Sequence, residues 1–225
     1  MKILTRLQEK FLAEFFQSFL KEDFFLTGGT ALSAFYLHHR LSEDIDLFTI
    51  NQSIEFNAVN SELLKIISFL SGKIQHQVSS PTFLQFILNI NKNMLKIDLV
   101  KDTPVHFGKI KLISNYKIDS LENIAVGKLL ALFGRADAKD FVDLYFLLEI
   151  EKKIDFKILF NLAKKKDAGL SEFYLAGMMS KIEEIKYFPK TIRPVNEDKL
   201  RIFFLKLSKN LFKKKKPLKQ NSLLA

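Results

Sequence analysis

The chain of 225 residues contains no cysteine and no tryptophan. The absence of cysteine excludes a disulfide scaffold, a thiolate nucleophile and a cysteine-ligated zinc site. No apolar run reaches the length of about 18 residues that a membrane-spanning helix needs. Near the N-terminus, Glu9, Lys10 and Glu14 interrupt the apolar run that a signal peptide needs. We therefore expect a cytoplasmic protein with no membrane partner.

The composition is that of a soluble globular protein. Hydrophobic residues make up 48% of the chain and charged residues 27%, which is the balance expected of a protein with a sizeable core. Phenylalanine occurs 23 times, so we expect much of that core to be phenylalanine. The length leaves room for one domain, or for one domain and a smaller annex.

Positive charge is concentrated in the last third of the chain. Residues 1–150 contain 16 Lys and Arg against 17 Asp and Glu, whereas residues 151–225 contain 19 against 8. A basic region beside a neutral one is typical of proteins that bind phosphate-rich partners such as nucleic acids. The alternative is a solvated helical surface. For the lysine run at 213–217 alone we favour that alternative, and we expect a disordered tail.

The spacing of hydrophobic residues predicts an N-terminal part with both helices and strands and a C-terminal part with helices alone. In the N-terminal part we expect helices over 3–20, 30–39 (with Thr30 as its N-cap) and 55–71, and strands over 24–26, 44–48, 83–91 and 93–101. A hairpin turn at 91–93 joins the last two strands. From 119 onward only helices are expected, over 120–133, 137–150, 155–166, 170–186 and 197–212. The predicted fold class is α/β (α+β), with a domain at 1–118 and a helical region at 119–225 that is basic after 150.

Three carboxylates lie on two of the predicted strands. Because strand side chains alternate between faces, Asp44 and Asp46 point the same way, about 6.5 Å apart. Asp98 faces the same polar cleft from the 93–101 strand, whose leucine and isoleucine side chains face the core. Oxygen ligands of this kind suit Mg²⁺. Three of them are enough to hold two ions that clamp the attacking and leaving oxygens of a phosphoryl displacement.

A glycine pair stands where the first predicted strand meets the following helix. Gly28 and Gly29 lack a Cβ, so the backbone N–H groups at this helix start form a natural phosphate cradle. The motif is neither GxxxxGK[ST] nor GxGxxG. A glycine pair alone is usually only a turn. A strand with two aspartates one residue apart (the DxD motif, here Asp44 and Asp46) is, taken alone, commonly a surface strand. The order of turn, helix, DxD strand and a later strand carboxylate is far more specific.

Two blocks of this sequence resemble a known family. The run LTGGTAL at 26–32, continued by HRLSEDIDL at 39–47, closely resembles the nucleotidyltransferases of the AbiEii/AbiGii toxin family. These belong to the DNA polymerase beta-like nucleotidyltransferase superfamily. A later block at 128–144 resembles the family's C-terminal motifs. The resemblance covers roughly residues 22–150, and it implies a nucleotidyltransferase-like mixed sheet with flanking helices, followed by a helical C-terminal region.

The resemblance implies a role for each matching position of the first block. Gly28, Gly29 and Thr30 would bind the triphosphate of a nucleotide. Asp44 and Asp46 would bind Mg²⁺. Asp98 is similar to the third metal-binding carboxylate, which can also deprotonate the acceptor hydroxyl.

In the later block, Lys128 resembles the essential lysine of the family, which faces the triphosphate. Arg135 and Lys139 match positions of the C-terminal motifs, and we assign them, with Arg40, to nucleotide binding. Family members need an acidic residue in this block. Asp140 and Asp143 both qualify, and the resemblance does not choose between them.

Other interpretations of these residues stay open. Asp140 and Asp143 can be surface acids paired with Lys139 and Arg135, each pair worth less than about 1 kcal/mol. Arg40 can pair with Glu43 or Asp44, although we favour a supporting role at the site. Adjacent helical residues point about 100° apart, so we expect the histidines at 38 and 39 to be surface residues at a helix end and not a metal site.

By resemblance, the expected function is a Mg²⁺-dependent transfer of a nucleotidyl group from an NTP to an acceptor hydroxyl. The family is the toxin half of bacterial toxin–antitoxin and phage-defence pairs, and some members add nucleotides to the acceptor end of tRNA. The basic last third favours tRNA as the acceptor. A cognate antitoxin is implied by resemblance only. The alternatives are a nucleotidyltransferase that modifies a protein or a small molecule, and a non-catalytic protein that binds nucleic acid.

Overall fold

The computed structural model describes residues 3–213. In this part of the chain seven strands form one mixed sheet with the order β3-β4-β5-β2-β1-β7-β6. β2 runs parallel to β5 and antiparallel to β1, and β1 runs parallel to β7. The strands are β1 (Phe25–Thr27), β2 (Ile45–Thr49), β3 (Lys73–Ser79), β4 (Phe83–Ile90), β5 (Asn93–Lys101), β6 (Lys111–Ile113) and β7 (Tyr116–Ile118).

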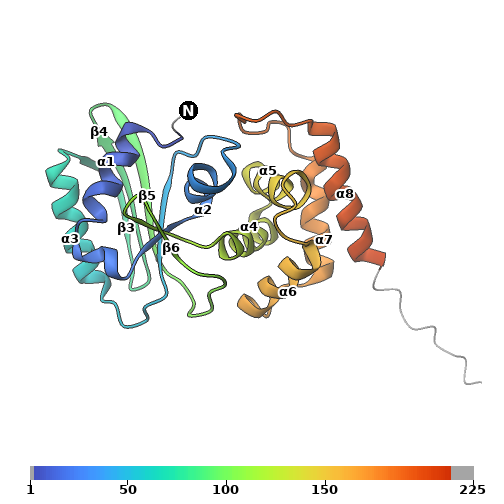
Figure 1. The fold of residues 1–225 in the computed structure, drawn as a ribbon, viewed down its shortest axis with the longest axis horizontal. Coiled ribbons are helices and arrows are strands. Elements are labelled where there is room, and N and C mark those ends of the chain that lie inside the picture. The colour runs from blue at the N-terminus through green and yellow to red at the C-terminus, as the bar shows by residue number, and fades with distance from the viewer. Residues whose placement is uncertain (1–2, 214–225) are drawn as a thin grey trace, which may run out of the picture.

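Helices lie on both sides of this sheet. α1 and α3 lie on one side, whereas α2 and the later helices lie on the other (Figure 1). α2 continues without a break as a π-helical segment over Leu32–Leu37, and α5 continues in the same way over Phe146–Ile150. The helices are α1 (Arg6–Phe15), α2 (Gly28–Ala31), α3 (Phe56–Phe69), α4 (Leu121–Arg135), α5 (Ala138–Tyr145), α6 (Phe156–Lys166), α7 (Glu172–Ser180) and α8 (Glu197–Lys213).

The predicted fold class is confirmed. All strands of the described chain end by Ile118, and only helices follow up to residue 213. The predicted hairpin is also present, since β4 and β5 pair antiparallel around Asn91 and Lys92. Both turn residues have positive φ, at 51° and 65°, which matches the twist that two-residue hairpins require. The division into domains at residue 118 stays a prediction.

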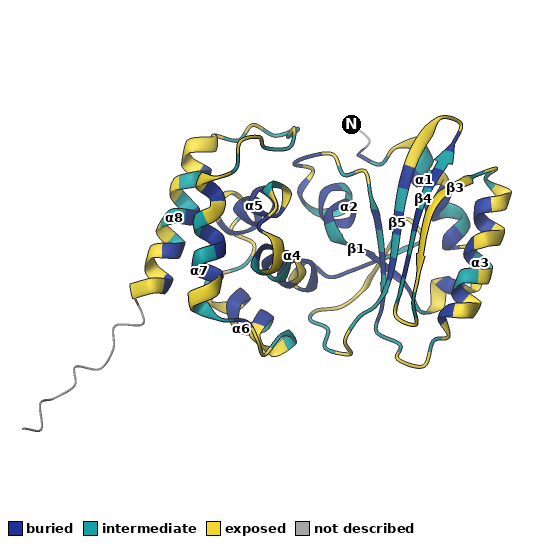
Figure 2. Cartoon of the chain, turned by 180° about the vertical axis from the view of Figure 1, so that it is seen from behind, coloured by how far each residue is buried: buried dark blue, intermediate teal, exposed yellow. Residues whose placement is uncertain are grey.

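Several local predictions were wrong. The helix expected from Thr30 begins two residues earlier, at Gly28, and follows Thr27. The side chain of Thr30 caps nothing; it donates a hydrogen bond to the backbone carbonyl of Asp44. β3, β6 and β7 were not expected. β3 is exposed along its whole length (Figure 2), so it carries no alternation of buried and exposed residues.

Phenylalanine is prominent in the core, as its frequency predicts. Many of the largest fully buried side chains are phenylalanines, and edge-to-face pairs link them, such as Phe15 with Phe24 at 5.8 Å and Phe141 with Phe204 at 4.9 Å. Such geometry is favoured by the ring quadrupole. No helix among residues 3–213 is long and apolar enough to cross a membrane. The predicted tail beyond Lys213 lies outside the described residues.

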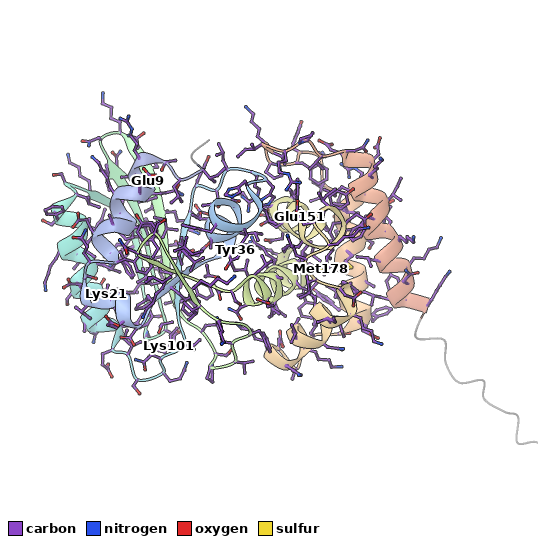
Figure 3. The ribbon with its side chains drawn as sticks, viewed as in Figure 1. Glu9, Lys21, Tyr36, Lys101, Glu151 and Met178 are labelled. Carbon is purple, nitrogen blue, oxygen red and sulfur yellow. The ribbon has the colours of Figure 1, made fainter. Side chains whose placement is uncertain are left out.

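Hydrogen bonds join the sheet part to the helical part. Tyr36, labelled near the centre of Figure 3, donates a hydrogen bond of 2.6 Å from its hydroxyl to the backbone oxygen of Asp119. The backbone N–H of Ile192 donates to the carbonyl of His39 at 2.7 Å, and Arg40 bridges to Thr191. The sheet part and the helical part are therefore joined by direct hydrogen bonds.

Candidate active site

Two of the predicted carboxylates lie on neighbouring parallel strands. β2 and β5 place Asp46 directly opposite Asp98. Burial alternates along β2 as predicted, so Ile45 and Leu47 are buried and Asp46 between them is half-buried. Asp44 lies just before the first residue of β2. The sheet register thus brings a residue of the DxD motif beside the third strand carboxylate.

The half-buried position changes the acidity of Asp46. Its pKa is raised from 3.8 to about 6, chiefly by burial and also by the neighbouring carboxylates of Asp98 and Asp44, against the opposing charge of Lys128. Desolvation and like charges both disfavour an ionised carboxylate. A cation placed here would remove that penalty.

The glycine pair is required by its neighbours. Gly28 has a φ of +66°, and a Cβ at this position would overlap the carboxylate of Asp46. A Cβ on Gly29 would lie 2.6 Å from the guanidinium of Arg40. Gly28 thus lets the backbone approach the carboxylate, whereas Gly29 makes room for an arginine behind it.

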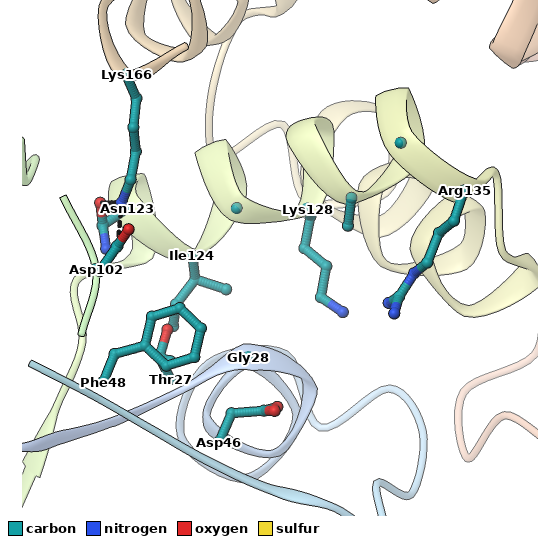
Figure 4. Close-up of a pocket in the computed structure, with 13 residues that line it drawn as sticks. Thr27, Gly28, Asp46, Phe48, Asp102, Asn123, Ile124, Lys128, Arg135 and Lys166 are labelled. Carbon is teal, nitrogen blue, oxygen red and sulfur yellow. Dashed lines mark hydrogen bonds and ion pairs between the residues drawn. The ribbon is translucent and has the colours of Figure 1, made fainter. Parts of the chain in front are cut away.

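Lys128 projects from α4 toward the DxD strand (Figure 4). Its ammonium lies 2.7 Å from Asp143 and 3.1 Å from Asp140. Burial alone would lower the pKa of Lys128, but the two carboxylates outweigh burial and the pKa is raised. The side chain therefore stays charged close to Asp46.

Asp140 and Asp143 are fully buried, so the alternative interpretation of these residues as surface acids is wrong. Arg40 binds both carboxylate oxygens of Asp143, at 2.7 and 2.8 Å. Arg135 donates to Asp140 at 2.9 Å. Burial would raise the pKa of Asp143, but Lys128 and Arg40 hold it well below its usual range. The two acids lie behind the basic residues and orient them.

A cleft of about 360 Å³ opens between β1 and β2 on one side and α4 on the other (Figure 4). Four of the predicted site residues line it: Gly28, Asp46, Lys128 and Arg135. The cleft also has apolar walls from Phe48 and Ile124. A glycine turn, a carboxylate and two cations on facing walls can bind a phosphate chain together with a metal ion.

The other predicted site residues do not line this cleft. Arg40, Thr30, Asp140 and Asp143 are buried beneath it, and Lys139 is exposed to solvent. Asp98 turns its carboxylate toward Gln85 and Lys96, at 2.9 and 2.8 Å. The remaining predicted residues outside the cleft lining are Gly29 and Asp44.

Most of the chain matches one family of proteins. Residues 10–214 match the model of the nucleotidyl transferase AbiEii toxin family, of a type IV toxin–antitoxin system. The chain belongs to the AbiEii family. It is therefore an enzyme of the nucleotidyltransferase type and a toxin-type protein, as the two sequence blocks predict. Family membership implies an NTP substrate and an antitoxin partner.

Similar proteins match this AbiEii chain over most of its length. An uncharacterized protein of Aquifex aeolicus (strain VF5) is 26% identical over 206 residues, covering 88% of this chain and 89% of its own. An H. pylori structure assigned as a nucleotidyltransferase has a TM-score of 0.60 at 18% identity and covers 93% of both chains. MenT4, a nucleotidyltransferase toxin of Mycobacterium tuberculosis, has a TM-score of 0.56 at 13% identity, with 91% of this chain and 85% of its own covered. The two structures share the fold of this AbiEii chain.

Sequence reasoning missed two basic residues of this AbiEii site. His39, expected at the surface, is fully buried, and its Nε2 lies 2.7 Å from Asp143. Burial lowers its pKa. Lys96 pairs with Asp98 at 2.8 Å, and its pKa is raised, against desolvation, by Asp98 and the other two site carboxylates. Side chains two residues apart on a strand lie on the same face, so Lys96 shares the face of Asp98. This spacing in the sequence could have identified Lys96 as a site residue.

The carboxylates of this AbiEii chain fit a magnesium site in chemistry. Carboxylate oxygens are the ligands that Mg²⁺ prefers, and Gly28 leaves the carboxylate of Asp46 uncovered toward the cleft. Among residues 3–213, however, no three acidic or histidine side chains are gathered closely enough to hold a metal ion. The Asp98 carboxylate would have to turn away from Lys96 to join Asp46, so the three-carboxylate set stays a prediction.

Proposed function

We propose that this AbiEii protein transfers a nucleotidyl group from an NTP to a hydroxyl of tRNA in a Mg²⁺-dependent reaction. The observation that carries the proposal is the cleft in which Asp46 faces Lys128 and Arg135, with the Gly28 turn between strand and helix. Opposite charges on facing walls suit a metal-bound triphosphate, which is negative along its length and holds a cation. The proposed ligands of up to two ions are Asp44, Asp46 and Asp98.

The reaction breaks one phosphoanhydride linkage and forms one phosphate ester linkage. The acceptor oxygen bonds to the α-phosphorus, the bond from that phosphorus to the β-phosphate oxygen breaks, and pyrophosphate leaves. Lys128 and Arg135 bind the phosphate oxygens and stabilise the charge that moves to pyrophosphate. Asp98 is the group proposed to accept the hydroxyl proton. Mg²⁺, when bound, supplies charge stabilisation and aligns the attacking and leaving oxygens.

The helical part supports a nucleic-acid acceptor. Residues 151–213 contain 15 Lys and Arg against 8 Asp and Glu, and nearly all of these lysines are exposed. The exposed Lys164 and Lys165 directly precede Lys166, which lines the cleft. A basic surface that leads to the reaction centre suits the phosphate backbone of tRNA.

The acceptor class is tested by tRNA binding at several salt concentrations. We expect the binding constant to fall steeply with salt, and substituting Lys164, Lys165, Lys206 and Lys209 by glutamine to weaken binding and reduce the slope by about one unit per lost phosphate contact. A control variant carries Lys65→Gln, a substitution within the nearly neutral residues 1–150. Absence of tRNA binding with NTP binding intact would favour a protein or small-molecule acceptor. tRNA binding without NTP binding would favour a non-catalytic nucleic-acid-binding protein.

A further inference from the structure

The nucleotide cleft has a second polar end that the phosphate chemistry does not use. Lys166, the last residue of α6, lies 2.6 Å from Asp102, which follows β5. The same ammonium lies 3.2 Å from the side-chain oxygen of Asn123. In Figure 4 this group lies across Phe48 and Ile124 from Lys128. All three polar side chains line the cleft.

This end is poorly suited to phosphate. The charge of Lys166 is balanced at short range by Asp102, and both side chains are largely buried, at 8% and 16% exposed. A phosphate placed here would meet the carboxylate of Asp102 and would be repelled. By contrast, the Lys128 end offers cations that face Asp46. The two ends of the cleft therefore suit two different parts of one ligand.

We infer that Lys166, Asp102 and Asn123 form the base-recognition end of the cleft, and that they favour bases with an exocyclic amino group over uracil. The inference rests on the proposed NTP-dependent function. Phe48 and Ile124 supply apolar walls between the two ends, where a planar base with its ribose fits. A nucleotide bound this way has its triphosphate beside Lys128 and its base edge against Asp102.

The preference follows from the open hydrogen-bonding positions. One N–H of Lys166 is directed to Asp102 and another to Asn123, so one remains. Asp102 accepts from Lys166 through one oxygen and from the backbone N–H of Thr103 through the other, at 2.8 Å, and each oxygen keeps a further lone pair. The amide nitrogen of Asn123 donates one of its two N–H groups to Asp119 at 2.9 Å, which leaves one donor, and the amide oxygen keeps one lone pair beside the bond from Lys166. Open acceptors thus outnumber open donors, which suits an amino group that brings two donors; uracil offers a single N–H.

Equilibrium dialysis with each of the four α-³²P-labelled NTPs and Mg²⁺ tests this inference. We expect the wild type to bind UTP about tenfold more weakly than its preferred nucleotide, the effect of roughly one hydrogen bond to a charged group. Asp102→Asn preserves shape and converts an acceptor into a donor, so it should narrow that gap by a similar factor. Glu62→Gln removes a carboxylate from α3, outside the cleft, and should leave all four affinities unchanged.

Three results would overturn the inference. Equal binding of UTP and the other nucleotides by the wild type would show that this end does not select an amino group. An equal loss of affinity for all four nucleotides in Asp102→Asn, with an unchanged melting temperature, would show that Asp102 acts on a part common to all four nucleotides and does not select the base. Absence of any NTP binding by the wild type would instead contradict the proposed function itself, and the inference would fail with it.

Discussion

The ammonium of Lys128 lies 2.7 Å from the carboxylate of Asp143, which is fully buried. The buried carboxylate therefore holds the lysine in position where it enters the cleft lined by Asp46. Arg40 and His39 hold the same carboxylate from the other side. A buried carboxylate with several cationic partners acts as a unit, because removing one member leaves the others buried and uncompensated.

Asp143→Asn is expected to destabilise the protein by about 3 kcal/mol, since Arg40 and Lys128 lose the charge that compensates their burial. Urea unfolding near neutral pH measures this change. Asp23→Asn, which replaces the carboxylate beside Asn51 by an amide of the same shape, is the matched control. It should change the free energy of unfolding by less than about 0.5 kcal/mol. A loss at Asp143 as small as that of the control would mean that the buried cluster does not act as a unit.

Lys128→Met is expected to weaken NTP binding by about 10- to 100-fold, because a charge-assisted hydrogen bond to phosphate contributes roughly 1.5–3 kcal/mol. Arg135→Met should have a smaller effect, since 61% of the Arg135 side chain is exposed and water screens its charge. Equilibrium binding of one labelled NTP compares the two variants. The account of the cleft is contradicted if the Arg135 variant loses more affinity than the Lys128 variant.

Gly28→Ala is expected to abolish NTP binding and to lower stability by more than about 1 kcal/mol, because the residue has positive φ and a Cβ would displace the Asp46 carboxylate. Gly177→Ala in α7 is the matched control. Apart from its chain neighbours and the backbone of its own helix, nothing lies within 4 Å of its Cβ position, so this substitution should stabilise the helix by roughly 0.5–1 kcal/mol. Thermal unfolding and NTP binding of both variants measure the difference between the two substitutions. The expectation is wrong if Gly28→Ala binds NTP with the affinity of the wild type.

The raised pKa of Asp46 predicts a pH dependence of stability. The folded-state value of about 6 lies above the ordinary 3.8, so folding favours the protonated form. Below about pH 4 the Asp46 carboxyl group does not reduce the free energy of unfolding. Its destabilising effect grows as the pH rises to about 6 and stays constant above that pH. After allowance for screening, the penalty at pH 8 is roughly 1–2 kcal/mol.

Asp46→Asn should therefore be more stable than the wild type at pH 8 without Mg²⁺, and the advantage should vanish near pH 4. Adding Mg²⁺ should stabilise the wild type and not the variant, because only the wild type keeps the Asp46 carboxylate that is proposed to bind the ion. Melting temperatures over this pH range, with and without Mg²⁺, measure both effects. Equal stability at every pH would show that the Asp46 carboxylate carries no penalty.

The sequence predicts most elements because their local patterns are strong. Alternation predicted strands at 44–48 and 93–101, which the structure shows as β2 and β5, and helical periodicity identified α4 and α8. β3 escaped because it is exposed on both faces. The burial of His39 and Asp143 could not be read locally, since their contact joins positions 104 residues apart. Lys166 and Asp102 meet only when α6 packs near the end of β5, which no local pattern encodes.

The most direct test of the account is a transfer assay with purified protein, tRNA, Mg²⁺ and each α-³²P-labelled NTP. An Asp44→Ala/Asp46→Ala variant, checked for folding by circular dichroism, is the control. We expect label in tRNA with the wild type alone, together with release of pyrophosphate and loss of labelling on chelation of Mg²⁺. Label on a protein, or label in tRNA that persists in the double variant, would contradict the proposed reaction.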